Sequence, residues 1–276
     1  MFSRVYVEIT NICNKSCSFC HGTKREKRSM TMDEFALVCD RLSGVTEYIY
    51  LHVMGEPTVH PLLCDFISHA SKKGFKVAVT TNGSLLPKCG DEMIDAGVYK
   101  VNVSLHSFES GESEKHAGYI NGCLDFADKA SRRGVLTVLR LWNGGVTDTF
   151  NSETLAILHE RFPEKWHFGA RGARIRDKLH LENAERFIWP DLKNEDLGDD
   201  LFCHGLGDHF GILSNGDAVP CCLDGDDEIR LGNIYTEEAK EILNSPRALA
   251  IKNGFKNKKA VEELCKKCPY ARRFKI

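Results

Sequence analysis

The stretch VYVEITNICNKSCSFCHG, from Val5 to Gly22, places three cysteines directly behind a run of alternating residues. The run Val5–Thr10 has the alternation of a buried β-strand. Cys13, Cys17 and Cys20 then follow in the spacing C-x-x-x-C-x-x-C, among polar neighbours. The sequence therefore predicts a strand that leads into a loop carrying three clustered thiols.

Strand-like and helix-like segments alternate through the first part of the chain. The predicted strands are Val5–Thr10, Tyr48–Val53, Lys76–Thr81, Lys100–Leu105, Val135–Leu141 and Trp166–Ala170. The predicted helices are Met32–Leu42, Pro61–Lys72, Pro87–Ala96, Gly122–Arg133 and Ser152–Arg161, the first opened by Thr31 and Glu34 in capping-box spacing. Such alternation is typical of an α/β fold, in which helices cover parallel strands.

The pattern changes near Gly172. Residues 173–201 are polar and aperiodic, which predicts a connection between a core of residues 1–172 and a smaller domain of residues 202–276. In this second part, His209–Leu213 and Ala218–Cys222 flank an Asn-Gly pair, which is a strong hairpin signal. A helix near Thr236–Asn244 is expected to follow.

Composition narrows the classes of partner. Hydrophobic residues make up 42% of the chain and charged residues 28%, with a net charge of -2. This balance does not favour nucleic-acid binding, which usually needs a concentrated basic surface. The basic run Lys24–Arg28 is the local exception, and we interpret it as a solvated loop rather than a phosphate or substrate site. The N-terminus lacks a signal peptide, and no apolar run spans a membrane. We therefore expect a cytoplasmic protein whose 12 cysteines are metal ligands or core residues.

The three thiols in the first loop admit several explanations. Free cysteines are often buried core residues, but these three have polar neighbours. A structural zinc site needs four ligands, and His21, next to Cys20, cannot easily turn to the same ion. A [4Fe-4S] cluster held by three thiolates would keep one iron open to another ligand. In this last explanation, the absence of a fourth thiol leaves a binding site on the open iron.

The spacing of these cysteines, with Phe19 before the last of them, resembles that of radical S-adenosylmethionine (SAM) enzymes. The resemblance implies that Cys13, Cys17 and Cys20 hold a [4Fe-4S] cluster whose open iron binds SAM. It also implies cleavage of SAM to a 5'-deoxyadenosyl radical. The fold implied is a partial (β/α)6 barrel, followed by a small domain with a β-hairpin and a helix that binds a second cluster.

Further motifs support this resemblance. Met54-Gly-Glu-Pro57 is similar to the family's Gly-Gly-Glu-Pro, which implies that Gly55 and Glu56 contact the SAM ammonium. Met54 stands where the family has its first glycine, and this difference puts the local backbone geometry in question. Asn82, Ser104 and Arg140 follow or end later strands, where ligands bind in parallel α/β folds. The resemblance implies that they face the ribose or carboxylate of SAM.

Four cysteines in the last part of the chain form a second set. Cys203, Cys221, Cys265 and Cys268 satisfy the ligand requirement of either zinc or an iron–sulfur cluster. The order Cys203, Gly216, Cys221 resembles the opening of SPASM and twitch domains, and the set resembles that of deoxy-scyllo-inosamine dehydrogenase. This resemblance implies a second, auxiliary [4Fe-4S] cluster.

The resemblance predicts a radical SAM oxidoreductase served by a flavodoxin- or ferredoxin-type reductant. Because the first strand starts near Met1, we expect no N-terminal module for a leader peptide, which favours a small-molecule or short-peptide substrate. Oxidation is the expected outcome, with Asp224 as a candidate proton acceptor. One alternative is an epimerase in which Cys222 donates a hydrogen atom. Another is a non-catalytic iron–sulfur electron carrier or a zinc-binding module.

Overall fold

The computed structural model of the chain describes residues 1–109, 113–147 and 149–274. Its strands within these ranges are β1 Arg4–Val7, β2 Tyr48–Tyr50, β3 Lys76–Thr81, β4 Lys100–Ser104, β5 Leu136–Gly144, β6 His167–Gly169, β7 Gly172–Arg176, β8 Leu179–Glu185, β9 His209–Ile212, β10 Asp217–Val219 and β11 Gly232–Asn233. Its helices are α1 Met32–Leu42, α2 Leu63–Lys72, α3 Leu86–Asp95, α4 Ser113–Arg132, α5 Asn151–Arg161, α6 Ala239–Leu243, α7 Pro246–Lys256 and α8 Glu263–Lys266, with short 3-10 turns η1 Pro57–Val59, η2 Leu105–Ser107 and η3 Pro269–Arg273.

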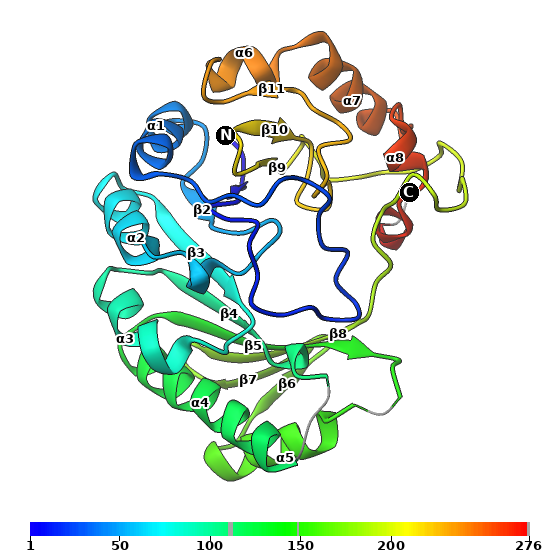
Figure 1. The fold of residues 1–276 in the computed structure, drawn as a ribbon. Coiled ribbons are helices and arrows are strands. Elements are labelled where there is room, and N and C mark those ends of the chain that lie inside the picture. The colour runs from blue at the N-terminus through cyan, green and yellow to red at the C-terminus, as the bar shows by residue number, and fades with distance from the viewer. Residues whose placement is uncertain (110–112, 148, 275–276) are drawn as a thin grey trace.

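All the strands belong to one curved sheet with the order β11-β10-β9-β1-β2-β3-β4-β5-β8-β7-β6. The strands from β9 to β8 in this order run parallel, and the outer ones are antiparallel. Helices α1 to α5 cover the outer face, and α6 to α8 lie beside the open side (Figure 1). The predicted α/β fold with a partial barrel is confirmed, and the sheet is not closed.

The two faces of the parallel strands differ in polarity. The face beneath the helices is apolar and fully or almost fully buried, as at Val5, Val7, Ile49, Val77, Val79, Val101, Val103, Leu139 and Leu141. Alternate residues point into the barrel, where Tyr6, His52, Asn102 and Arg140 line one cavity. Because neighbouring strand residues face opposite sides, the apolar face builds the core and leaves the other for polar groups.

The sixth barrel strand differs from the prediction. The expected strand 166–170 is observed as β6, but β6 is an exposed edge strand that pairs antiparallel with β7. The place beside β5 belongs to β8, where Leu179 and Leu181 are buried. The start of the expected connection 173–201 is therefore wrong, because residues 172–176 and 179–185 are strands. Their inner residues, such as Glu182, are polar, so only two buried leucines mark β8 in the sequence.

The predicted C-terminal hairpin forms and extends the barrel sheet. β9 and β10 pair antiparallel, and β9 also pairs parallel with β1, with Arg4 opposite His209. Strand β10 ends at Val219, earlier than predicted. The predicted capping box is present, since Thr31 and Glu34 each accept the other's backbone N–H. Among the helices that the structure describes, none has the length and apolar character to cross a membrane.

Candidate functional site

The loop between β1 and α1 carries the first three cysteines, and we call residues 11–28 the cluster loop. Cys13 and Cys20 are exposed, and Cys17 is partly buried; all three are free thiols. Burial raises the pKa of Cys13, and burial followed by the Glu109 carboxylate raises that of Cys17 to about 11. Cys20 lies close enough to add to both shifts. A metal centre that binds these neighbouring thiols as thiolates would have to displace their protons.

Gly55 brings a second segment against the cluster loop. Its φ is +77°, and a Cβ there would lie 2.4 Å from the Thr10 carbonyl oxygen and 2.8 Å from the Asn11 carbonyl carbon. The Glu56 N–H donates to the Ile12 carbonyl at 2.9 Å. Only glycine permits both this conformation and this close backbone approach.

The departure at Met54 does not disturb this segment. Met54 lacks the positive φ that would require glycine. Its N–H donates to Glu8 at 3.0 Å, and its side chain is buried against Gly225. The methionine side chain therefore fills the contact between this segment and the C-terminal region, which we define as residues 202–274.

The Glu56 carboxylate organises the rest of this edge. It is 2% exposed and accepts hydrogen bonds from the Asn82 N–H at 2.6 Å, the Thr81 hydroxyl at 2.7 Å and the Thr58 hydroxyl at 2.6 Å. The Asn82 side chain donates in turn to Asn14 of the cluster loop at 2.9 Å. Two predicted SAM contacts, Glu56 and Asn82, are thus joined to the loop of Cys13 and Cys17.

Ser104 and Phe19 lie at the same edge of the sheet. The Tyr119 hydroxyl lies within hydrogen-bond distance of the carbonyls of Asn82, at 2.6 Å, and Ser104, at 3.2 Å. The Phe19 ring packs on His106, with 5.2 Å between ring centroids. The segment after β8 also covers Phe19, because the Arg186 guanidinium lies 5.6 Å from its ring centroid and the Trp189 indole N–H donates to its carbonyl at 3.0 Å. Neither of these two covering residues was predicted.

Arg140 lies in the barrel interior. Its Nε donates to Glu182 at 3.1 Å, and its guanidinium lies 4.3 Å from the centroid of the Trp142 ring. Burial lowers the pKa of Arg140, and Glu182 opposes this shift. The structure therefore pairs the predicted SAM contact with a carboxylate that the sequence did not connect to it.

A cavity of about 470 Å³ separates the inner face of the barrel from the C-terminal region. The second set of thiols, Cys203, Cys221, Cys265 and Cys268, lines this cavity. Burial, and then neighbouring thiols that include Cys203, raise the pKa of Cys221 and Cys265 well above the ordinary value. Four thiols from distant parts of the sequence thus meet at one site.

The number and type of these donors fit an iron–sulfur cluster. A tetrahedral zinc site brings its sulfur atoms to about 3.8 Å from one another. Among the described residues, no three Cys, His, Asp or Glu side chains converge closely enough to hold one ion. A cluster of four irons spreads its cysteine ligands further apart, so the donor set and its cavity suit that larger group.

Cys222 lies in the same cavity as Cys221. Both residues line the cavity and lie beyond the end of β10 at Val219. Strand alternation does not continue into the turn that follows. Burial raises the pKa of Cys222, while a hydrogen bond with Tyr6 and the charge of Arg4 oppose that shift.

Asp224 also lines the cavity and is 1% exposed. Its two carboxylate oxygens accept the N–H groups of Glu228 and Ile229, each at 2.9 Å. Burial raises the pKa of Asp224 to about 6. The side chain therefore holds the turn after Cys222 as well as facing the cavity.

Asp227→Asn is expected to stabilise the protein above pH 7. Burial, and then the Asp217 carboxylate, raise the pKa of Asp227 to about 7. Its protonated form therefore stabilises the fold at low pH, and this stability is lost as the pH rises from about 4 to 7. Because Asp227 is only partly buried, we expect a gain of roughly 1–2 kcal/mol, or about 2–5 °C in Tm, at pH 8.

Thermal unfolding of the metal-free protein at pH 5 and pH 8 tests this expectation. Asparagine tolerates the positive φ of 63° at this position, so the backbone is retained. An equal change in Tm at both values of pH would contradict the expectation, since it would not depend on ionisation.

Several site residues were missed by the sequence-based predictions. Inward positions within the predicted strands hold all four of Glu8, Tyr6, His52 and Asn102. The available signal was a polar or aromatic side chain alternating with buried aliphatic residues. Arg25 and Trp189 gave no such signal, because they lie in irregular segments.

Comparisons with known proteins agree with this arrangement. Residues 7–163 match the Radical SAM superfamily, and residues 203–269 match SPASM, an iron–sulfur cluster-binding domain. Together these matches imply SAM and [4Fe-4S] clusters, including an auxiliary cluster in the SPASM domain.

One similar curated protein is the tungsten-containing aldehyde ferredoxin oxidoreductase cofactor-modifying protein of Pyrococcus furiosus. It is 33% identical over 124 residues, which cover 42% of this chain and 34% of that protein. The chain thus spans about a third of the length of the curated relatives it matches.

Two solved structures share the fold over nearly the whole chain. BtrN in complex with AdoMet and 2-DOIA has a TM-score of 0.64 and 17% identity, covering 97% of this chain and 93% of BtrN. Native anSMEcpe with bound AdoMet and a Cp18Cys peptide has a TM-score of 0.59 and 16% identity, covering 98% and 86% of the two chains. With its Radical SAM match over residues 7–163 and its SPASM match over residues 203–269, the chain belongs to the radical SAM superfamily.

Proposed function

We propose that the chain oxidises a small polar molecule by radical SAM chemistry, with the substrate bound in the cavity between the barrel and the C-terminal region. The observation that carries this proposal is the composition of the cavity wall. The second set of thiols and the polar inner face of the barrel face the same space of about 470 Å³.

Four polar atoms of that wall are buried without a hydrogen-bond partner among the described residues: His52 Nδ1, Asn102 Oδ1, Trp142 Nε1 and His209 Nδ1. An unpaired buried polar atom costs about 1–3 kcal/mol, which a bound ligand can offset. The indole N–H of Trp142 only donates, and Asn102 Oδ1 only accepts. A molecule with hydroxyl or amino groups supplies both kinds of partner, and the part of the cavity that the second cluster would leave free suits a small molecule or a short peptide segment.

The proposed ligands of the first cluster are Cys13, Cys17 and Cys20, and those of the second are Cys203, Cys221, Cys265 and Cys268. When bound, SAM and its cluster supply a 5'-deoxyadenosyl radical that removes a hydrogen atom, and the auxiliary cluster offers an acceptor for the electron that oxidation releases.

Other side chains have proposed roles around these groups. Phe19, Gly55, Glu56, Asn82, Ser104 and Arg140 are the proposed contacts of SAM. Asp224 lines the cavity and is the proposed acceptor of the substrate proton. A flavodoxin- or ferredoxin-type protein is the proposed electron donor.

Radical epimerisation is the second candidate function. It is favoured by the position of Cys222, whose thiol lines the cavity together with Tyr6. In this reaction the substrate radical regains a hydrogen atom from the Cys222 S–H on its opposite face. The Cys222 thiyl radical that remains takes one electron from the proposed flavodoxin- or ferredoxin-type donor and one proton from solvent. The product then has the mass of the substrate, whereas oxidation makes it lighter by two hydrogens.

Cys222→Ala distinguishes the two reactions. We expect the variant to form the oxidised product at a rate within about twofold of the wild type, because oxidation needs no donor at this position. Product mass is measured by mass spectrometry in H₂O and D₂O, on a molecule that stimulates 5'-deoxyadenosine formation in a screen of hydroxylated amines and short peptides. Cys64→Ala, a partly buried helix cysteine outside the cavity, is the matched control.

Two outcomes of this experiment would support the epimerase instead. One is a wild-type product that keeps its mass in H₂O and gains one unit in D₂O, since a thiol hydrogen exchanges with solvent. The other is loss of the inverted product in Cys222→Ala while 5'-deoxyadenosine continues to form.

A further inference from the structure

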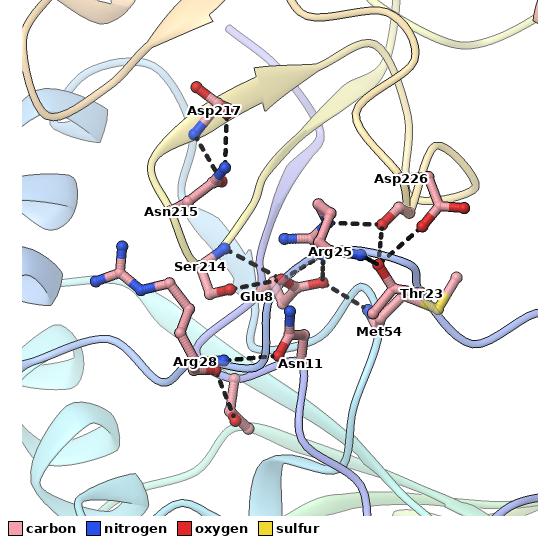
Figure 2. Close-up of polar contacts among 12 residues, drawn as sticks. Glu8, Asn11, Thr23, Arg25, Arg28, Met54, Ser214, Asn215, Asp217 and Asp226 are labelled. Carbon is pink, nitrogen blue, oxygen red and sulfur yellow. Dashed lines mark hydrogen bonds and ion pairs between the residues drawn. The ribbon is translucent and has the colours of Figure 1, made fainter.

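Glu8, just beyond the end of β1, is a fully buried carboxylate that joins three separate segments (Figure 2). Arg25 of the cluster loop donates from Nη2 to both carboxylate oxygens, each at 2.7 Å. The Met54 N–H donates to Oε2 at 3.0 Å. Ser214, in the hairpin turn of the C-terminal region, donates from its N–H at 3.1 Å and its hydroxyl at 2.9 Å. One side chain thus contacts the cluster loop, the segment before Gly55 and the C-terminal region.

Arg25 is held at two points. Besides its contacts with Glu8, its Nε donates to the Gly225 carbonyl at 2.8 Å. Its side chain is only 12% exposed. Arg25 stands five positions after Cys20, and Gly225 stands four positions after Cys221. The arginine therefore connects the loop of the first thiol set to the turn that follows Cys221 of the second set.

Asp226 strengthens this connection at the same place. Its Oδ1 accepts the Thr23 hydroxyl and the Lys24 N–H, both at 2.8 Å, and its Oδ2 lies 3.3 Å from His21 Nε2. Figure 2 shows Asp226 beside Arg25 and Thr23. The second half of the cluster loop is thus attached to residues of the C-terminal region rather than to the barrel alone.

Charge makes Arg25 the central member of this group. Among the described residues, Arg25 is the cationic side chain with a nitrogen atom within 4.0 Å of a Glu8 carboxylate oxygen. A buried carboxylate that loses its partner is strongly unfavourable, so the surrounding segments must move or admit water. Removing Arg25 is therefore expected to disturb the loop more than removing an exposed ion pair does.

We propose that Glu8 and Arg25 are positioning residues that hold the cluster loop against the C-terminal region, so that SAM binding at the first site depends on this buried pair. The proposal rests on the proposed role of Cys13, Cys17 and Cys20 as ligands of the SAM-binding cluster. It assigns neither residue a contact with SAM or with a metal.

The test compares Arg25→Gln and Glu8→Gln with a matched control, Arg41→Gln. Arg41 of α1 also contacts the C-terminal region, where it donates to the carbonyls of Ile234 and Glu237. Among the described residues, its hydrogen bonds and ion pairs do not reach the cluster loop. The control therefore removes an arginine that links the same two parts of the chain elsewhere. The double variant Glu8→Gln/Arg25→Gln shows whether the two residues act as a unit.

Two measurements are made on each protein. Amide hydrogen exchange of residues 21–28 is measured in the metal-free protein, and the dissociation constant of SAM and the SAM-induced change in the EPR spectrum are measured after anaerobic cluster reconstitution. We expect Arg25→Gln to exchange about tenfold faster in this segment and to bind SAM about tenfold more weakly, with Arg41→Gln unchanged. The double variant should be no worse than Arg25→Gln alone.

Several results would overturn the proposal. One is the same exchange rate of residues 21–28 in Arg25→Gln and Arg41→Gln. Another is faster exchange of this segment in Arg25→Gln while the dissociation constant of SAM is unchanged. If Glu8→Gln does not fold, Arg25→Gln decides by itself, because Arg25 is 12% exposed whereas Glu8 is fully buried. A wild-type protein that fails to bind SAM would contradict the proposed function, whereas the exchange rates of the metal-free proteins would still decide whether the pair holds the loop.

Discussion

Simultaneous replacement of Cys13, Cys17 and Cys20 by alanine is expected to abolish 5'-deoxyadenosine formation. These thiols are neighbours in the cluster loop, and without them the first cluster has no cysteine ligands there. The measurement is 5'-deoxyadenosine by liquid chromatography after reconstitution with iron and sulfide and addition of dithionite and SAM. We expect the signal to fall at least 10³-fold, to the background of the assay.

Iron content supplies the control for this experiment. The second thiol set shares no residue with the first, so the triple variant should retain about half of the approximately eight irons expected for two [4Fe-4S] clusters. Continued 5'-deoxyadenosine formation by the triple variant would contradict the proposed ligand set. Zinc in the C-terminal region, with iron bound at the first site alone, would contradict the proposed auxiliary ligands.

Gly55→Ala is expected to lower SAM cleavage by about 10²-fold. Its Cβ would lie 2.4 Å from the Thr10 carbonyl oxygen, and its φ of +77° is unfavourable for alanine. Because the obstacle is backbone rather than a flexible side chain, the segment before Glu56 must move away from the cluster loop. A displacement near 1 Å in a reactive site can cost about 10²-fold in rate. The rate of 5'-deoxyadenosine formation and the dissociation constant of SAM are the measurements.

Gly74→Ala is the matched control for this prediction. Gly74 has a φ of +91°, but no atom lies within 4 Å of a Cβ built on it. Both substitutions therefore introduce a strained backbone, and only Gly55→Ala also introduces a collision. Equal losses of SAM cleavage in the two variants would mean that the close approach to Thr10 does not matter.

Much of the barrel follows from local patterns. The predicted strands near Val5, Tyr48, Lys76, Lys100 and Val135 are all present, because their aliphatic residues pack beneath the helices. The sixth strand of the barrel could not be predicted in the same way. Strand β6 has no buried residue, and β8 has an apolar face of only two buried leucines, so periodicity pointed to the wrong segment.

The residues of the candidate site likewise divide into those that the sequence predicts and those that only the structure reveals. Gly55 and Glu56 could be predicted as site residues because their motif is contiguous in the chain. The environment of Cys222 was not predictable, because the predicted strand ran to Cys222 whereas β10 ends at Val219. Arg25 stood within a basic run that reads as a solvated loop, and its burial depends on Glu8 and Gly225, which are distant in sequence.

The sequence by itself determined the family, the first cysteine set and the α/β alternation, because these depend on spacings within one loop or one strand. Only the tertiary structure decided which strand completes the barrel, that Cys222 shares a cavity with Cys221, and that Arg25 links Glu8 to Gly225. These features depend on burial and charge pairing between segments up to about 200 positions apart. Local periodicity carries no information about such partners, since they become neighbours only when the chain has folded.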